Sequence, residues 1–185
     1  MPVRLTRAQI DAALPQVAVG LAQYQWLQQQ FAANVNAHGD ATFRRRFNHF
    51  YRVRRNTVWQ ASYFALIGIA RQQALQFNAV LDALRQATNR LEASFASKLI
   101  ATINPTLPVI DKFVLKNVGL TLPAQNVPNR AAAIVRVHAA LQDSFSAYLQ
   151  SADGQYLVSE FNRRYPNAGI TEVKMLDLVL WQTRD

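Results

Sequence analysis

The densest run of chemically useful side chains lies between residues 43 and 56. Six arginines within twelve positions alternate with four aromatic residues; they are Arg44, Arg45, Arg46, Arg52, Arg54 and Arg55, interleaved with Phe43, Phe47, Phe50 and Tyr51. A guanidinium can hold a phosphate through two hydrogen bonds, and an exposed aromatic ring can stack on a base. The run therefore predicts a nucleic-acid contact. The structural alternative is that the rings form the core and the arginines order the domain internally.

A second candidate group combines a carboxylate with an amine. Asp111 falls in the first turn of a helix expected from Pro108 to Gly119, where a carboxylate favours the helix dipole and can cap backbone N–H groups. It could also stabilise a developing cation or act as a base. Lys98 has small and apolar neighbours, and burial there would lower its pKa and make the amine a nucleophile. The alternative is a purely capping carboxylate and a surface amine.

The remaining polar and aromatic candidates favour structural roles. The three histidines are isolated and show no metal-ligand spacing, so neither a metal nor a cofactor is expected. The tryptophans are interpreted as core or lobe-packing residues, namely Trp26, Trp59 and Trp181. Lys174 and Asp177, three positions apart on the last expected helix, are predicted to form a surface ion pair that contributes little to stability.

Composition narrows the class of protein. The chain has 185 residues, of which half are hydrophobic and only 17% are charged, which argues against disorder and fits a single domain over residues 1–185. The absence of cysteine excludes disulfides, thiol nucleophiles and cysteine-bound metals. The net charge of +9 is concentrated in residues 1–60, which carry eight arginines against two aspartates. A local positive field attracts polyanions, nucleic acid above all, although an arginine-rich genome would give the same excess.

The hydrophobic pattern predicts helices and no strand. Apolar residues recur at helical spacing almost throughout, which indicates an all-α domain of eight to ten helices with possible lobes at about 1–90 and 91–185. One helix is expected to run to about Asn34, with a buried stripe that continues to Val35. No apolar stretch has the composition of a secretory signal or a membrane span, so a cytoplasmic protein without a membrane partner is expected.

The segment 108–120 resembles the proline-valine-aspartate segment of helix-hairpin-helix base-excision DNA glycosylases. It reads Pro-Val-Ile-Asp-Lys-Phe-Val and closes on Val-Gly-Leu. In that superfamily the aspartate at the start of this helix is catalytically essential, and an upstream lysine forms a Schiff base in bifunctional members. The resemblance implies a two-lobed glycosylase-like core, Asp111 as the catalytic aspartate, Lys98 as the nearest candidate lysine, and DNA rather than RNA as the partner.

Two functions of different classes follow from these observations. The first is a nucleic-acid-binding protein with a glycosylase-like core that would excise a damaged base. The second is a non-catalytic helical interaction module, because residues 91–97 contain neither glycine nor proline where the hairpin turn of that superfamily is glycine-rich. The chain as a whole also resembles a family of bacterial proteins with similar segments at 50–59, 93–99 and 108–115, a resemblance that implies no activity.

Overall fold

The computed structural model describes residues 3–183, and these residues form ten α-helices and no strand. The prediction of an all-α fold with eight to ten helices is confirmed. In chain order the helices are α1 (Arg7–Ala13), α2 (Ala18–Ala33), α3 (Ala41–Tyr51), α4 (Thr57–Gln73), α5 (Phe77–Thr88), α6 (Ala93–Ile103), α7 (Lys112–Val118), α8 (Arg130–Leu149), α9 (Ala152–Arg164) and α10 (Glu172–Gln182). None of these helices is both long enough and apolar enough to cross a lipid bilayer.

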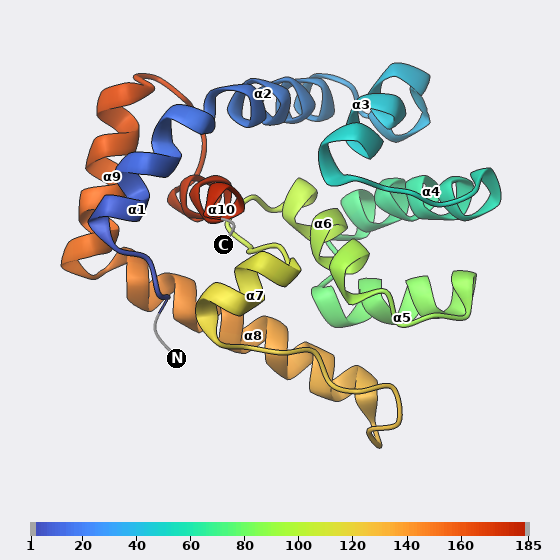
Figure 1. The fold of residues 1–185 in the computed structure, drawn as a ribbon. Coiled ribbons are helices and arrows are strands. Elements are labelled where there is room, and N and C mark those ends of the chain that lie inside the picture. Colours follow the sequence, from blue (N-terminus) through green and yellow to red (C-terminus); the bar gives the residue numbers. More distant parts are fainter. Residues whose placement is uncertain (1–2, 184–185) are drawn as a thin grey trace.

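The last helix, α10, lies near the middle of the fold, and segments from both ends of the sequence surround it (Figure 1). α1 packs against α9 and α10, while α7 and α8 also contact α10. The helices α2 to α6 follow one another on the other side, with α2 against α3 and α5 against both α4 and α6. α5 also packs on α8, so the two groups of helices share one continuous core.

Local sequence signals explain where α3 and α4 begin and end. Asp40 caps α3 by accepting a hydrogen bond from the Phe43 N–H at 2.7 Å, and Asn56 caps α4 in the same way. α3 ends at Tyr51 because Arg52 adopts the left-handed conformation, with φ 54° and ψ 45°. The chain therefore turns sharply after Tyr51, and Arg54 and Arg55 lie outside the helix.

The aromatic residues of α3 face inward, as their spacing predicts. Phe43, Phe47, Phe50 and Tyr51 are all buried, and the Phe47 ring centroid lies 4.7 Å from that of Tyr51. These rings join others from α2, α4 and α10 in the core. The structural alternative is thus correct for the aromatic residues of this run, because the helix uses them for packing and leaves Arg45 and Arg46 exposed.

Two details of the sequence interpretation are wrong. Val35 does not continue the buried stripe of α2, because the helix ends at Ala33 and 61% of Val35 is exposed. Residues 108–110 are not helical, and α7 begins at Lys112 with Asp111 as its N-cap. Pro108 and the two residues after it are buried in the approach to the helix, so Asp111 stands just before the first turn.

Candidate functional site

A groove between α2 and α3 brings four exposed arginines together. It consists of two adjoining hollows of about 540 Å³ and 590 Å³, both of which are lined by Gln23 of α2 and His49 of α3. None of the described residues that line the two hollows is acidic. We call this surface the arginine groove; its lining includes Gln23, Trp26, Asn48, His49 and, from α10, Trp181, together with Arg45, Arg46, Arg52 and Arg54.

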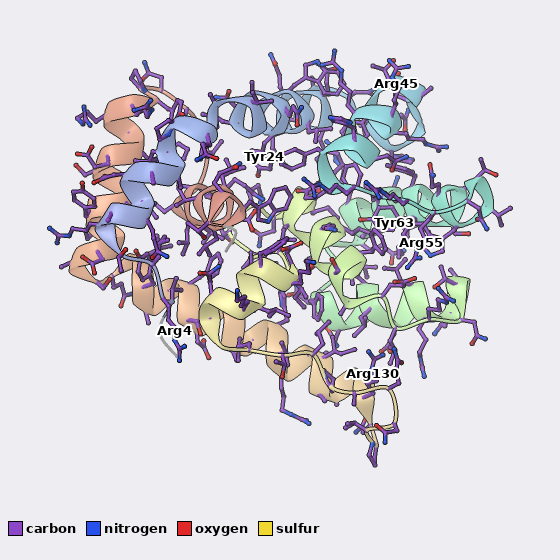
Figure 2. The ribbon with its side chains drawn as sticks, in the orientation of Figure 1. Arg4, Tyr24, Arg45, Arg55, Tyr63 and Arg130 are labelled. Atoms are coloured by element: carbon purple, nitrogen blue, oxygen red, sulfur yellow. The ribbon has the colours of Figure 1, made fainter. Side chains whose placement is uncertain are left out.

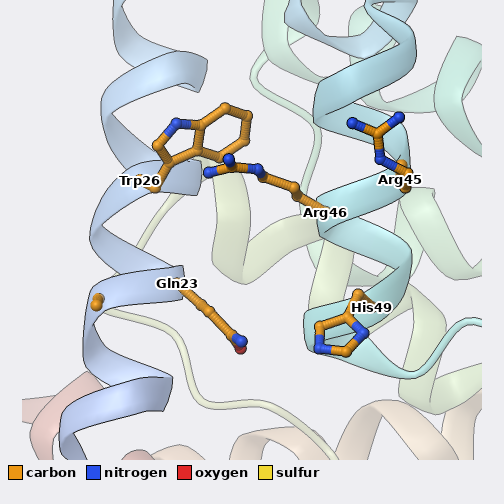
Figure 3. A pocket seen from close by; sticks show the side chains of 6 residues that line it. Gln23, Trp26, Arg45, Arg46 and His49 are labelled. Atoms are coloured by element: carbon orange, nitrogen blue, oxygen red, sulfur yellow. The ribbon is translucent and has the colours of Figure 1, made fainter.

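The four arginines of the groove are exposed, and within residues 3–183 none of them forms an ion pair. Arg45 lies on the outer side of α3 (Figure 2). Arg46 reaches across to α2, where its guanidinium carbon lies 4.1 Å from the centre of the Trp26 ring (Figure 3). Because no carboxylate neutralises these groups, the groove presents several positive charges to a ligand.

The other two predicted nucleic-acid-binding arginines have partners inside the protein. The Arg44 Nε donates a hydrogen bond to the His38 carbonyl oxygen at 2.6 Å, and its guanidinium lies over the Phe64 ring. Arg55 donates to both carboxylate oxygens of Glu92, at 2.9 Å and 3.1 Å. These two side chains are half-buried and tie α3 and the following turn to neighbouring elements, so the structure separates them from the groove.

Trp26 is one of two tryptophans of the groove that the sequence analysis assigned to packing; the other, Trp181 of α10, packs against Phe50 with ring centroids 5.5 Å apart. The Trp26 ring does pack against the core, but it is only half-buried and it also lines the 540 Å³ hollow. The adjacent Ala22 is one helical turn away on the same side of α2, so the wall around the indole is apolar. The sequence signal that this side of α2 meets solvent was the polarity of the neighbouring residues Gln23, Gln25 and Gln28.

A second basic hollow, of about 700 Å³, lies near α5 and α8. Its lining includes Arg55, Arg85, Arg90 and Arg130, but it also contains Glu92. Arg85 is 3.9 Å from Asp82, and Arg130 donates to the Pro123 carbonyl oxygen. Most of the positive charge in this second hollow is thus engaged within the protein, which distinguishes it from the arginine groove.

Asp111 is partly exposed in a third hollow. Its Oδ1 accepts a hydrogen bond from the Phe113 N–H at 2.9 Å, which is the N-cap interaction of α7. The side chain also lines a hollow of about 750 Å³ together with Ser94, Lys112 and Lys116. The carboxylate is therefore not sealed inside the protein, and it has cationic side chains on the same wall.

Lys98 is buried close to Asp111. Only 7% of the residue is exposed, and its Nζ donates a hydrogen bond to the Tyr51 carbonyl oxygen at 3.1 Å, at the C-terminal end of α3. Burial lowers the pKa of the Lys98 amine; the carboxylates of Asp111 and Asp177 oppose this effect and the Arg52 guanidinium adds to it. The alternative interpretation of Lys98 as a surface amine is therefore wrong. The buried amine lies in the electrostatic range of both Asp111 and the groove residue Arg52.

An ion pair predicted for the surface is instead in the core. Lys174 Nζ and Asp177 Oδ2 are 2.6 Å apart, and each side chain is only 1% exposed. Burial raises the pKa of the Asp177 carboxyl, although the Lys174 amine acts in the opposite direction. The spacing on α10 predicted the pair correctly, but the sequence analysis missed its burial because other helices provide the cover.

Aromatic rings from α2 and α3 enclose this pair. The Lys174 Nζ lies 4.7 Å from the centre of the Tyr24 ring and 6.0 Å from that of Tyr51. Figure 2 places Tyr24 between α2 and α10. Burial raises the pKa of both tyrosine hydroxyls, so both remain neutral. We call this group of Tyr24, Tyr51, Lys98, Lys174 and Asp177 the inner cluster.

The histidines do not form a metal site. Among the described residues, no three histidine, aspartate or glutamate side chains come together in a way that could hold a metal ion. His138 is buried on α8, where its Nε2 lies 3.2 Å from the Pro108 carbonyl oxygen and its ring stacks on Phe77 at 4.0 Å. Burial lowers the pKa of His138 to about 4, so the ring is neutral at pH 7 and packs as part of the core.

Comparison with known proteins adds no relative. The chain matches no protein-family model, no curated protein and no solved structure.

Proposed function

We propose that this protein binds nucleic acid through the arginine groove. The observation that carries the proposal is that Arg45, Arg46, Arg52 and Arg54 line one continuous groove in which no described lining residue is acidic. Guanidinium groups pair with phosphate oxygens in a planar, two-point geometry, and neutralising these phosphates releases the cations condensed on the nucleic acid. Affinity that depends on such contacts falls steeply with added salt.

A salt titration of binding tests this proposal. A fluorescein-labelled mixed-sequence DNA is titrated with protein, in single-stranded and in duplex form, and anisotropy is recorded at several salt concentrations. Four phosphate contacts predict that log K falls with log salt with a slope of about −3 to −4 for duplex and about −3 for single strands. The double variant Arg45→Gln/Arg52→Gln should reduce the magnitude of this slope by about 1.4 to 1.8.

The second basic hollow supplies the matched control. Arg85→Gln/Arg90→Gln removes the same net charge at another surface and should leave the slope within about 0.5 of the wild-type value. If the two double variants reduce the salt slope equally, binding depends on the overall charge of the protein, and this result would contradict a defined groove. Absence of binding to either DNA at low salt would contradict the proposal altogether. If Arg45→Glu/Arg52→Glu lowers the free energy of unfolding by more than it lowers the free energy of DNA binding, the arginines order the domain internally.

Base excision is a second candidate function, favoured by the partly exposed carboxylate of Asp111 in its 750 Å³ hollow. In this reaction the bond between the sugar C1′ and the base nitrogen breaks, and its electron pair leaves with the base. The Asp111 carboxylate would stabilise the resulting sugar cation. Water then attacks C1′ and gives up a proton, which Asp111 or solvent accepts. Lys98 would attack in place of water only in a bifunctional enzyme.

The variant Asp111→Asn separates this chemistry from the folding role of the residue. Asparagine caps a helix about as well as aspartate does, so α7 should remain capped while the negative charge is lost. We expect excision of a damaged base from an oligonucleotide to fall at least a hundredfold, with DNA affinity within about threefold of wild type.

Borohydride treatment during the reaction would show whether Lys98 takes part. A bifunctional enzyme becomes covalently attached to the DNA through a reduced Schiff base, and Lys98→Gln should abolish the attachment. If wild-type protein binds DNA but excises none of a panel of deaminated, oxidised and alkylated bases, the candidate enzyme function is wrong. The protein is then the non-catalytic helical module.

A further inference from the structure

We propose that the arginine groove takes an unpaired nucleic-acid strand and that one base of this strand stacks on Trp26. This inference rests on the proposed nucleic-acid binding and specifies the form of the ligand. It also gives Trp26 a role that the packing interpretation does not.

The surroundings of Trp26 suit a flat aromatic ligand. The indole lines the 540 Å³ hollow beside Ala22, between α2 on one side and the Arg45, Arg46 and His49 side chains of α3 on the other (Figure 3). Each nucleobase has a π-face that can stack on an aromatic side chain, irrespective of sequence. The hollow thus combines an apolar platform with charged groups at its edge, which matches a base and its attached phosphate.

Arg46 currently occupies the position that the base would take. Its guanidinium is itself planar and lies over the indole at 4.1 Å, so the platform already binds a flat cationic group. Arg46 is exposed, and its long side chain can move without disturbing the core. On binding, a base replaces the guanidinium on the ring, and Arg46 becomes free to contact the adjacent phosphate.

The groove continues from this platform along α3. Arg45 and the C-cap residue Arg52 are seven positions apart, which corresponds to about 10 Å along the helix axis. Stacked bases in a helical strand rise about 3.4 Å per nucleotide, so this distance spans at most roughly three nucleotides. Gln23 lines the interval and offers an amide group that can bond to base edges.

A duplex cannot use this arrangement fully. Its bases are stacked inside the double helix, and a base reaches an aromatic platform only where the strand is unpaired or the base is flipped out. Charge alone would hold either form, whereas Trp26 favours the unpaired one.

The test compares a 12-nucleotide oligothymidylate with a 12-base-pair hairpin duplex, both fluorescein-labelled, at one low salt concentration. We expect wild-type protein to bind the single strand at least tenfold more tightly. Trp26→Leu should weaken binding to the single strand about tenfold or more without changing its salt slope, because a stacking contact and no phosphate contact is lost. Trp26→Phe, which keeps a ring, should remain within about threefold of wild type.

Tryptophan emission provides an independent readout on the unlabelled oligothymidylate. Stacking of a base should quench the Trp26 emission, so Trp26→Phe should lose most of the quenching that wild type shows. The matched control is Trp59→Phe, because Trp59 stacks on Tyr63 at 5.0 Å and is not among the residues that line the groove, and it should keep the quenching. The same measurement with an oligouridylate of equal length shows whether the groove prefers DNA or RNA.

Failure of this inference is distinct from failure of the proposed function. Equal or tighter binding of the duplex, or an unchanged single-strand affinity in Trp26→Leu, overturns the stacking proposal while groove binding still stands. Absence of binding to every probe overturns both. Far-ultraviolet circular dichroism of each variant confirms that the compared proteins are folded.

Discussion

The arginine groove and the inner cluster both use residues of α2 and α3, one at the surface and one in the core, and they use positive charge in different ways. On the outside of α2 and α3, the cations are arginines without ion-pair partners in the described chain. On the inside, the cations are Lys98 and Lys174, and each has a specific partner. An exposed charge costs little to leave unpaired, whereas a buried charge must be paired. The groove is therefore suited to a ligand and the inner cluster to holding helices together.

The largest change in folding stability is expected for a variant in the inner cluster. Asp177→Asn leaves the buried Lys174 without its counter-ion, and we expect the free energy of unfolding to fall by about 3–5 kcal/mol. Urea unfolding measures the change. The matched control is Glu160→Gln, which breaks the exposed Glu160–Arg163 pair at the same spacing and should leave the urea midpoint unchanged. Similar shifts in the two variants would show that burial does not distinguish the pairs.

A double variant sharpens this result. Lys174→Met/Asp177→Leu replaces both charges with apolar groups of similar size, and we expect it to be more stable than Asp177→Asn by at least about 2 kcal/mol. The measurement is again urea unfolding. A double variant as unstable as the single one would assign the loss to packing and not to the unpaired charge.

The next largest expected effect is a loss of folding stability in acid, caused by the buried His138. Its folded-state pKa of about 4 lies below the ordinary value of 6.5, so the unfolded chain binds a proton first as the pH falls. The free energy of unfolding therefore has its full value above pH 6.5. It falls by about 3 kcal/mol as the pH drops from 6.5 to 4. His138→Gln should remove this part of the pH dependence in urea unfolding at a series of pH values. An identical pH dependence in the variant would contradict the prediction.

Lys98→Met is expected to have an intermediate effect. It removes the hydrogen bond from the buried amine to the Tyr51 carbonyl oxygen at the end of α3. We expect a loss of about 1–3 kcal/mol in urea unfolding. A variant more stable than wild type would mean that the cost of burying the amine exceeds the value of this bond.

The smallest expected effect on stability concerns the groove. Arg45→Gln and Arg54→Gln are exposed changes without an ion-pair partner among residues 3–183, and each should alter the free energy of unfolding by less than about 0.5 kcal/mol. Thermal unfolding checks this, on the same protein samples used for DNA binding. Destabilisation by more than about 1 kcal/mol would indicate that these arginines support the fold.

The fold class could be predicted from sequence because local patterns determine it. Apolar spacing near 3.6 residues and the capping residues before α1, α3 and α4 are visible without a structure. The inward face of α3 follows from the spacing of its aromatic residues. The N-cap role of Asp111 was also available from its position before α7.

The parts of the site that depend on distant helices could not be predicted. Lys174 and Asp177 are buried because Tyr24 and Tyr51, more than a hundred residues earlier in the chain, cover them. The division of the arginine run likewise depends on the turn at Arg52 and on Glu92, which withdraws Arg55 from the surface that the groove arginines share. Sequence spacing predicts neighbours on one helix, but not the element that packs against it.

The backbone of Arg52 has a consequence for how this protein could be altered. A non-glycine residue with φ 54° carries a strain of about 1 kcal/mol, which glycine would relieve at this helix end. The same change would delete a guanidinium from the groove and from the neighbourhood of Lys98. Thermostability and the proposed nucleic-acid affinity should therefore move in opposite directions at this single position, and a search for more robust variants that selects on folding alone would tend to discard the proposed binding.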